Sequence, residues 1–431
     1  MNRRSASWTR PLDKIEDVVA PDARTVVIRW KETYPDAGSI TTGFQALPRH
    51  ILQGPFERLD PEAFISQPYW TTEYVGLGPY KLRTWSQGSH VEGIAFDGHA
   101  FGKPKIERIT VKFFNDENVA FTNLLAGEVQ FATGRALRFE HGAQLRRDWG
   151  LANKGSVLLT PDTSRFVAAQ FRPELIASPG LLDIRTRRAI AHAIDRDALN
   201  LGIFEGEMEM SDLFLTRYSR YERVNDMDRA LNEANRTVTH YPYDERTSAL
   251  LMTEAGYTKG RDGMFSNASG EHLPLPVWSH TSPQYEKELQ ILVDSWRRAR
   301  LDAQPTVLPT AALRDGQLRA SFPALYIASS SRLESFITST ISSPANRWTG
   351  SNRGAWVNAE YDRVYNAFNT TLDPETRITQ AVQMLKILSD DIPAYVLYFN
   401  PSVAGFSSAV KGPDNASLNT DVWNVHEWVV S

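Results

Sequence analysis

The stretch from residue 75 to residue 130 constrains the fold of this chain most. Residues 75–82 read VGLGPYKL, and two glycines followed by a proline predict a turn with a fixed exit. Residues 80–85 and 109–113 alternate between apolar and polar side chains, which predicts two half-buried strands. Asp116 is placed to cap a short helix that Gly127 would end. The stretch therefore reads as a turn, two strands, a helix and the start of another strand.

The overall composition is that of a globular protein with room for several cores. The chain has 431 residues, of which 42% are hydrophobic and 23% are charged, so we expect two or three folded domains. A formal net charge of −4 gives no reason to expect nucleic acid or an anionic membrane as a partner. Eleven Trp and fifteen Tyr fit either large cores or an aromatic-lined pocket, and composition does not separate the two.

Several kinds of chemistry have no signature in this sequence. The absence of Cys excludes disulfides, thiolate zinc sites and Cys nucleophiles. There is no helical His pair for zinc, no phosphate-binding Walker loop and no Gly-x-Ser-x-Gly elbow. The abundant acidic residues leave a glycosidase-like carboxylate pair open, although no particular pair stands out. We therefore expect binding without catalysis, and we expect no cofactor and no metal.

Membrane and export signals are also missing from the printed sequence. No apolar run approaches the roughly 20 residues that a membrane span needs. Basic residues 3 and 4 are not followed by the apolar core of a signal peptide.

The order of motifs resembles that of the family 5 extracytoplasmic solute-binding proteins. Residues 75–82, 102–109 and 124–130 are similar, in this order, to the family patterns G-T-G-P-Y-x-L, G-x-P-x-L-D-x-I and L-x-x-G-E-V-D. Leu77 stands where the family has Thr, and Gln130 where it has Asp. Members of this family are receptors of ABC importers for peptides, nickel complexes and some sugars.

More motifs follow downstream. Residues 183–196 resemble D-x-R-V-R-x-A-x-x-x-A-I-D-R, which is the most specific single match, and their apolar spacing predicts helix. Residues 241–257 resemble a helix of the family whose sequence begins with Tyr-Asp-Pro and ends with Glu-Ala-Gly-Tyr. Residues 352–362 resemble N-x-x-G-Y-x-N-P-E-x-D, and residues 392–398 resemble a strand that returns to the main lobe. The resemblance runs from residue 15 to about residue 412.

The resemblance implies an α/β fold of the periplasmic binding protein type II class. This fold has two large lobes with a discontinuous chain and a hinge, and here the side lobe is expected to be partly missing. We expect residues 1–75 to be a strand-rich remnant of the side lobe. Residues 76–172 and 401–431 would form the main lobe and residues 173–400 the second large lobe. Segment 15–28 resembles a part that lies well inside the mature chain of the family, so a preceding segment with the export signal is expected.

The resemblance also implies a function. The chain would be the substrate-binding component of an ABC importer, a monomer that captures a peptide-like or other small solute in an interlobe cleft by hinge closure. Its partner would be the membrane permease. Its location would be periplasmic, or membrane-anchored through a lipid on the outer side of the cytoplasmic membrane. The alternative is the ligand-sensing domain of a cytoplasmic regulator, and a hydrolase is a third, weaker reading.

The resemblance finally suggests where the ligand binds. In peptide-binding members an Asp just after a buried strand pairs with the free ammonium of the peptide; here Ser329 takes that place, and Arg332 would repel an ammonium. We therefore expect that a free α-amine is not the main anchor, and that the ligand is a blocked or modified peptide, a saccharide or an anionic small molecule. The full set of expected ligand-binding residues is Gln170, Phe171, Trp278, Tyr326, Ser329, Ser331, Arg332, Asn352, Arg353 and Trp356.

Overall fold

The computed structural model describes residues 12–39, 47–134, 136–150, 152–216, 226–330, 332–414 and 421–431. The described residues fall into two compact units. Unit 1 draws on residues 1–29, 38–160 and 401–431, and unit 2 draws on residues 30–37 and 161–400. The predicted division into a side-lobe remnant and two large lobes stays a prediction.

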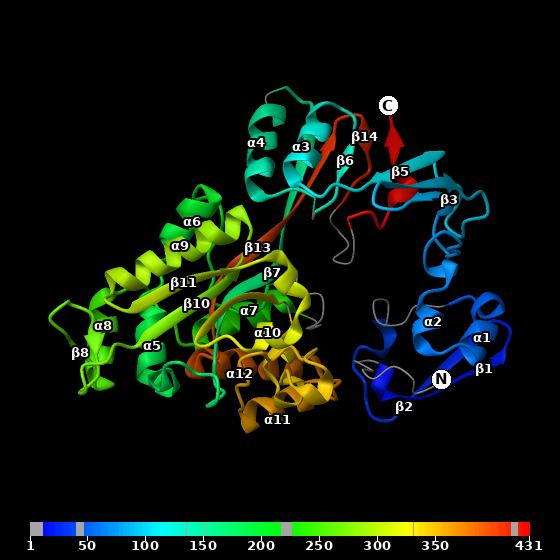
Figure 1. The fold of residues 1–431 in the computed structure, drawn as a ribbon. Coiled ribbons are helices and arrows are strands. Elements are labelled where there is room, and N and C mark those ends of the chain that lie inside the picture. Colours follow the sequence, from blue (N-terminus) through cyan, green and yellow to red (C-terminus); the bar gives the residue numbers. More distant parts are fainter. Residues whose placement is uncertain are drawn as a thin grey trace. The chain divides into compact units, whose positions relative to one another are not determined.

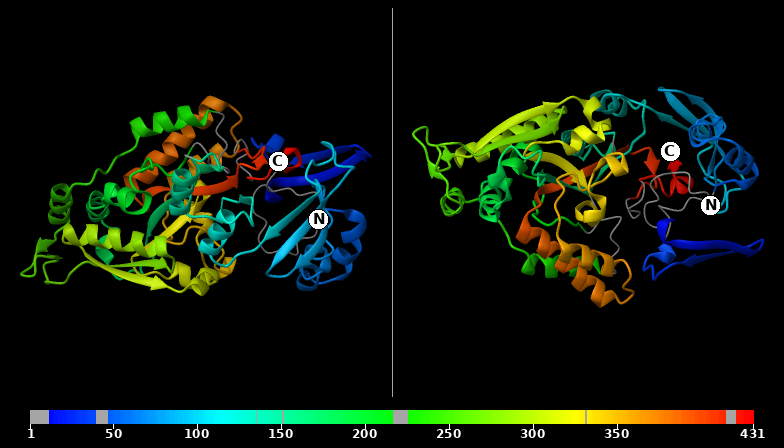
Figure 2. Two further views of the ribbon diagram at one scale, coloured as in Figure 1. Left: turned by 90° about the horizontal axis from the view of Figure 1, so that it is seen from above. Right: turned by 60° about the horizontal axis from the view of Figure 1, so that its bottom comes forward.

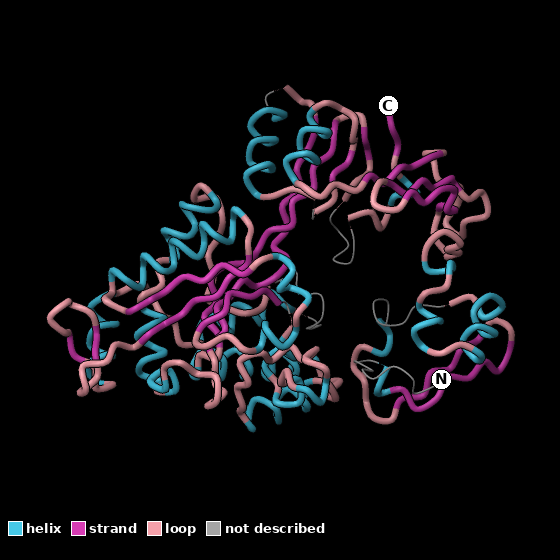
Figure 3. Tube along the Cα trace, viewed as in Figure 1, coloured by secondary structure: helices cyan, strands magenta, loops and turns pink. Residues whose placement is uncertain are grey.

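Two long strands have residues in both units. Strand β7 (Gly155–Ala169) enters unit 2 after residue 160, and strand β13 (Ala394–Ser407) leaves it after residue 400. Both are continuous strands along their whole length (Figure 3). The expected strand at residues 392–398 is therefore confirmed, and it is longer than the sequence pattern indicated.

Unit 2 is built around a mixed sheet. Within this unit the strand order is β11 (Asp302–Leu308), β10 (Pro274–His280), β12 (Leu325–Ser330), β7 and β13. Strand β10 runs parallel to β11 and β12, whereas β7 runs antiparallel to β12. The register places Ser329 directly opposite Arg165. Strands β8 (Thr258–Lys259) and β9 (Phe265–Ser266) form a separate antiparallel pair.

Helices cover both faces of this sheet. Figure 1 shows α6 and α9 along one side and α11 and α12 along the other. Helix α9 is amphipathic, and its buried face includes Leu289, Leu292 and Trp296. The helices of unit 2 are α5 (Ile184–His192), α6 (Arg196–Phe204), α7 (Met227–Thr237), α8 (Glu245–Glu254), α9 (Pro283–Arg298), α10 (Gly316–Ala320), α11 (Ala359–Phe368) and α12 (Pro374–Asp391).

The most specific sequence motif forms two helices with a break between them. Asp183 caps the first turn of α5 by accepting a hydrogen bond from the backbone N–H of Arg185. Asp195 then caps α6 by accepting from the N–H of Ala198. Because a capping residue has non-helical backbone angles, the second Asp ends the helical run and starts a new one.

Unit 1 holds smaller elements. Its strands are β1 (Ile15–Asp22), β2 (Thr25–Trp30), β3 (Tyr80–Ser86), β4 (His90–Ala95), β5 (Arg108–Lys112), β6 (Phe131–Ala132), β14 (Val410–Lys411) and β15 (Val429–Val430). Its helices are α1 (Arg49–Arg58), α2 (Pro61–Ile65), α3 (Glu117–Leu125) and α4 (Phe139–Gly150). Strands β1 and β2 form a two-stranded ribbon, seen in dark blue in Figure 2.

Residues 75–130 contain the two predicted strands and the predicted helix, but a further strand, β4, lies between the two strands, and most of β5 is exposed rather than half-buried. Strands β3 and β5 flank β4 in an antiparallel sheet. Asp116 caps α3 by accepting hydrogen bonds from the N–H groups of Asn118 and Val119. Gly127 has a φ of 77°, a conformation that suits glycine and ends the helix. A buried cluster that includes Leu124, Leu145 and Val403 joins α3 and α4 to β13 in unit 1.

Candidate functional site

The carboxyl ends of three parallel strands meet at one edge of the unit 2 sheet. Strands β10, β11 and β12 end there at His280, Leu308 and Ser330. Because β7 is antiparallel to β12, its residue Arg165 reaches the same edge. In open α/β sheets, ligands bind outside the carboxyl ends of the strands. This edge is therefore the candidate site that the topology of unit 2 offers.

A buried ion pair lies at this edge. Arg165 donates from Nε at 3.0 Å to both carboxylate oxygens of Glu288, and from Nη2 at 2.7 Å to Oε2. The side chains of Arg165 and Glu288 are 4% and 0% exposed. Tyr398 of β13 donates its hydroxyl to Glu288 Oε1 at 2.8 Å. The carboxylate thus has partners on two strands that also continue into unit 1.

Burial and the ion pair together set the protonation states of Arg165 and Tyr398. Burial opposes the charge of Arg165, but the charge and hydrogen bonds of Glu288 more than offset this and raise its pKa. Burial, reinforced by the charge of Glu288, raises the pKa of Tyr398 well above its usual value. Tyr398 therefore remains a neutral phenol that can donate. Because a buried ion pair generally adds little net stability, its presence on the apolar face of α9 calls for a functional explanation.

Arg165 makes two further side-chain contacts. Its guanidinium carbon lies 3.8 Å from the centre of the Tyr285 ring, a cation–π contact. Its Nη1 donates to Ser329 Oγ at 3.2 Å. Ser329 is exposed at the end of β12. One guanidinium thus connects a buried carboxylate to an exposed hydroxyl.

Four of the predicted ligand-binding residues are buried, and three of them bond through their side chains to backbone carbonyls or a carboxylate of unit 2. Gln170 donates from Nε2 to the carbonyls of Ala320 and Phe322, at 3.3 and 2.7 Å. Asn352 donates to three backbone carbonyls, including that of Trp356 at 2.9 Å. Trp356 donates from Nε1 to Asp391 Oδ2 at 3.0 Å. These side chains stabilise the fold of unit 2, and contact with a ligand stays a prediction for them.

Tyr326 is buried on the sheet face that α11 and α12 cover. Its hydroxyl lies 2.6 Å from Nε2 of the buried His280. Burial lowers the pKa of His280, and the charges of Arg319 and Arg165 lower it further, so the imidazole is neutral at pH 7. Trp278 and Phe171 are half-buried against the same core. The ring of Phe171 is also 5.1 Å from the guanidinium carbon of Arg187.

The other predicted residues lie in loops. Arg332 is 3.7 Å from Glu334, measured from Nη1 to Oε2, and its side chain is 43% exposed. The carbonyl of Arg353 accepts a hydrogen bond from Arg172. Ser331 lies outside the described residues.

Four predicted residues share one small pocket in unit 2. Tyr326, Asn352, Arg353 and Trp356 line it together with Phe336, among others, and it holds about 360 Å³ of space, part of it open to solvent. Ser329 is not part of this lining. Arg165, Glu288 and Tyr398 were not among the residues expected from the sequence. The available signal was Glu288 itself, a charge placed among the apolar positions of an amphipathic helix.

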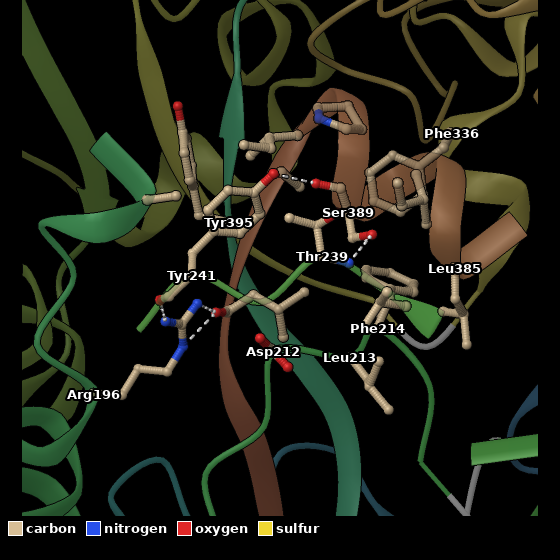
Figure 4. Close-up of a pocket in the computed structure, with 17 residues that line it drawn as sticks. Arg196, Asp212, Leu213, Phe214, Thr239, Tyr241, Phe336, Leu385, Ser389 and Tyr395 are labelled. Carbon is tan, nitrogen blue, oxygen red and sulfur yellow. Dashed lines mark hydrogen bonds between the residues drawn. The ribbon is translucent and has the colours of Figure 1, made fainter. Parts of the chain in front are cut away.

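A second pocket in unit 2 contains none of the predicted ligand-binding residues. It holds about 530 Å³ of space, part of it open to solvent. Figure 4 shows Arg196 at its edge, and this side chain donates to the carbonyls of Val396 and Tyr241. Tyr241 donates its hydroxyl to the carbonyl of Ser389. These polar side chains bond to the backbone of neighbouring segments and so stabilise the fold around the pocket.

Within the described ranges, no group of three or more His, Asp or Glu side chains could hold a metal ion. Among the helices of the described part of the chain, none combines the length and the apolar content needed to cross a membrane.

Comparison with solved structures defines the class of fold. NikZ from Campylobacter jejuni in complex with Ni(L-His) matches 97% of this chain and 79% of its own, with a TM-score of 0.76 and 18% identity. AppA from Bacillus subtilis in complex with a nonapeptide matches the same shares, with a TM-score of 0.74 and 16% identity. The fold is that of the type II periplasmic binding proteins.

The family follows from the sequence. The model of the bacterial extracellular solute-binding proteins, family 5 Middle, matches residues 1–346. The chain belongs to this family, which is a family of transport binding proteins and not of enzymes. The resemblance found in the motifs is thereby confirmed.

Curated relatives of this chain are longer than the chain itself. A candidate ABC transporter peptide-binding protein of Brucella ovis is 26% identical over 250 residues, which are 58% of this chain and 42% of the relative. The oligopeptide-binding protein AppA of Bacillus subtilis is 20% identical over 402 residues, which are 89% of this chain and 66% of the relative. The chain thus spans less than half of the length of the first of these relatives and about two thirds of the second.

Proposed function

We propose that this protein is the substrate-binding component of an ABC importer, which captures a peptide-like or other small solute. The observation that carries this proposal is the family match over residues 1–346. The exposed end of β12 at Ser329, on the carboxyl edge of the unit 2 sheet, supports a solute site there.

The proposal includes a partner and a location. The partner would be the membrane permease of the importer, and the binding protein would act as a monomer. The location would be the periplasm, or the outer side of the cytoplasmic membrane with a lipid anchor. Closure of two lobes on the ligand is the expected mechanism. Small-angle scattering with and without a saturating solute tests it, because an unchanged radius of gyration would contradict closure.

Capture from a defined mixture tests the function. The purified chain is incubated with a tryptic digest of casein, common mono- and disaccharides and Ni(II)-histidine, and is then separated by gel filtration. Mass spectrometry of the denatured protein fraction should find one solute class enriched over a heat-denatured control. A folded protein that retains nothing would count against the proposal, and hydrolysed peptides or sugars in the mixture would favour a hydrolase instead.

The alternative is the ligand-sensing domain of a cytoplasmic regulator, which the fold allows but no observed feature favours. The genomic sequence upstream of this chain distinguishes the two. A signal peptide with a lipidation Cys supports the importer, and a helix-turn-helix segment supports the regulator.

A further inference from the structure

The two strands that pass between the units change their burial at corresponding points. In β7, residues 164–167 are buried, whereas residues 155–163 are exposed or half-buried. In β13, residues 395–398 are buried, whereas residues 399–402 are half-buried. The division between the units falls inside both of these less buried stretches. Each crossing strand is therefore least covered where it leaves unit 2.

Each strand also carries a proline in its less buried stretch. These prolines are Pro161 in β7 and Pro401 in β13. A proline has no backbone N–H, so it cannot donate a hydrogen bond to a neighbouring strand. Both strands therefore have one hydrogen-bond donor fewer at the boundary between the units than a strand without proline would have.

Two side chains of α9 hold both strands next to this boundary, on the unit 2 side. The buried carboxylate of Glu288 accepts hydrogen bonds from Arg165 of β7 and from Tyr398 of β13. Gln284, one helical turn earlier, donates from Nε2 to Asn400 Oδ1 at 3.2 Å. Because a buried charge that loses a partner costs free energy, Glu288 resists separation of either strand from α9.

We propose that Glu288 and Gln284 form a clamp that ends the rigid part of both crossing strands. Bending of the chain between the units takes place beyond the clamp, in residues 399–402 of β13 and in the part of β7 before Ser164. The clamp gives the buried ion pair a role, which is to fix positions rather than to add stability. Its place in the closing motion rests on the proposed solute-binding function.

Hydrogen exchange of single backbone amides in the full chain, without solute, locates the flexible part. After correction for intrinsic rates, the amides of 164–167 and 395–398 should exchange at least about tenfold more slowly than those of 399–402 and of 155–163. If residues 399–402 exchanged as slowly as residues 395–398, the strand would have no flexible part there and the inference would be overturned.

Tyr398→Phe tests the hold on β13. It removes one hydrogen bond to Glu288 and leaves the pair with Arg165 intact. Amides 395–398 should then exchange about tenfold faster, because a hydrogen bond to a charged group is lost. Amides 325–328 of β12 should keep their rates. Equal acceleration in both strands would show a loss of overall stability only and would overturn the inference.

Tyr361→Phe is the matched control for this variant. Tyr361 of α11 is fully buried, as Tyr398 is, and donates its hydroxyl to the carbonyl of Leu333 at 2.8 Å. Neither Tyr361 nor Leu333 belongs to a crossing strand. The control should leave the exchange of amides 395–398 unchanged relative to that of β12.

A triple variant removes the bonds of Glu288 to both strands at once. Arg165→Met/Glu288→Leu/Tyr398→Phe replaces a buried polar group by apolar side chains of similar size, a change that other proteins tolerate. The buried parts of β7 and β13 should both exchange about tenfold faster relative to β12. Unchanged relative rates in a folded triple variant would overturn the inference.

Spin labels measure the motion itself. Because the chain contains no Cys, Leu125→Cys in α3 of unit 1 and Leu250→Cys in α8 of unit 2 would carry the only labels, at exposed positions. The distribution of distances between the labels should be broader in the triple variant than in the chain with the clamp. Equal widths would contradict a role of the clamp in limiting the motion.

These measurements need no solute, so they decide the inference separately from the proposed function. A chain that captures a solute but lacks the expected exchange pattern keeps its function and loses the clamp. A chain with the expected pattern that captures nothing keeps the clamp as a feature of its fold and loses the proposed function.

Discussion

The two sheets differ in how much of them is buried. In the unit 2 sheet, Val167, Leu275 and Ile327 are at most 1% exposed. In the three-stranded sheet β3–β4–β5 of unit 1, Gly93 is the one buried residue, and Val111 is 50% exposed. The strands of the unit 2 sheet contain runs of apolar residues, such as residues 166–169 and 325–328, whereas β3 and β5 alternate between apolar and polar residues. The alternation of β3 and β5 predicts that strands form but not how deeply they are covered. Helices on both faces decide the burial of the unit 2 sheet.

The same contrast holds for charged groups. In unit 2, the pair Arg165–Glu288 is buried. In unit 1, Glu92 binds Arg83 and Arg108 at 3.1 and 3.0 Å, but these arginine side chains are 48% and 63% exposed. Exposed pairs of this kind contribute little because water and salt screen them. Removing one charged side chain should therefore lower the free energy of unfolding more in unit 2 than in unit 1.

The largest effect is expected from breaking the buried pair. Glu288→Leu leaves Arg165 charged and unpaired, which should lower the free energy of unfolding by about 3–5 kcal/mol. Glu92→Leu in unit 1 should lower it by less than about 1 kcal/mol, and the loss should shrink further in salt. Urea denaturation of the two variants measures both. Equal losses of the free energy of unfolding would show that Glu288 and Glu92 are buried to a similar degree.

A core truncation should have the next largest effect. Leu292 is fully buried in α9, and Leu292→Ala should cost about 2–5 kcal/mol because it leaves a cavity. Val111→Ala, on the half-exposed sheet of unit 1, should stay within about 0.5 kcal/mol. Thermal unfolding of the two variants makes the comparison, and a large loss for Val111→Ala would mean that the sheet of unit 1 is covered in solution.

Two histidines should give the units opposite responses to pH. In unit 1, burial lowers the pKa of His141, whose Nδ1 accepts from Arg138 N at 3.2 Å. In unit 2, the hydrogen bond to the carbonyl of Asn235 raises the pKa of His240 against burial, and Asp212 adds to this. The contribution of His141 is complete above the unfolded pKa near 6.5 and is lost as pH falls through its folded pKa. That of His240 is complete below about 6.5 and is lost as pH rises through its folded pKa.

Unfolding at pH 5.5 and pH 8 tests this contrast. His141→Gln should remove part of the acid-side loss, and His240→Gln should remove part of the gain on acidification. The charges that face His141 are Asp116, Glu117, Arg138 and Glu140, and those that face His240 are Arg196 and Asp212. If the free energy of unfolding changed with pH in the same way in both variants, the two histidines would not have opposite effects on stability.

The smallest effect is expected from exposed apolar side chains of unit 1. Leu77 and Phe101 are 85% and 80% exposed. The double variant Leu77→Ser/Phe101→Ser should change the free energy of unfolding by less than about 0.5 kcal/mol. It should reduce any self-association seen by light scattering, since exposed apolar groups favour contacts between molecules. A clear loss of stability would show that these side chains are packed in solution.

Much of the secondary structure could be predicted because it is local. Asp116, Asp195 and Asp244 cap helices through atoms within three residues, and Gly127 and Gly256 adopt the positive φ that their positions suggest. The order of these local signals was also enough to indicate the family. Local signals of this kind do not depend on which unit surrounds them.

The candidate site was harder to predict because it depends on strand register. Arg165 and Ser329 are 164 positions apart, and Arg165 and Glu288 are 123 apart. Nothing in either neighbourhood indicates that β7 pairs with β12 in the register that brings them together. Residues chosen from motifs, such as Asn352 and Gln170, have polar side-chain atoms that bind the backbone of their own unit.

The passage of β7 and β13 between the units sets an order of assembly during translation. Unit 2 can be completed once residue 400 has left the ribosome, since its residues are 30–37 and 161–400. Unit 1 has to wait for Gly405 and Phe406, which pair with Ala132 and Phe131 of β6. At roughly 5–20 residues per second, its first half is exposed for roughly 12–50 s before its closing strand is made. Those seconds are the period in which α3, α4 and β6 most need protection from wrong partners.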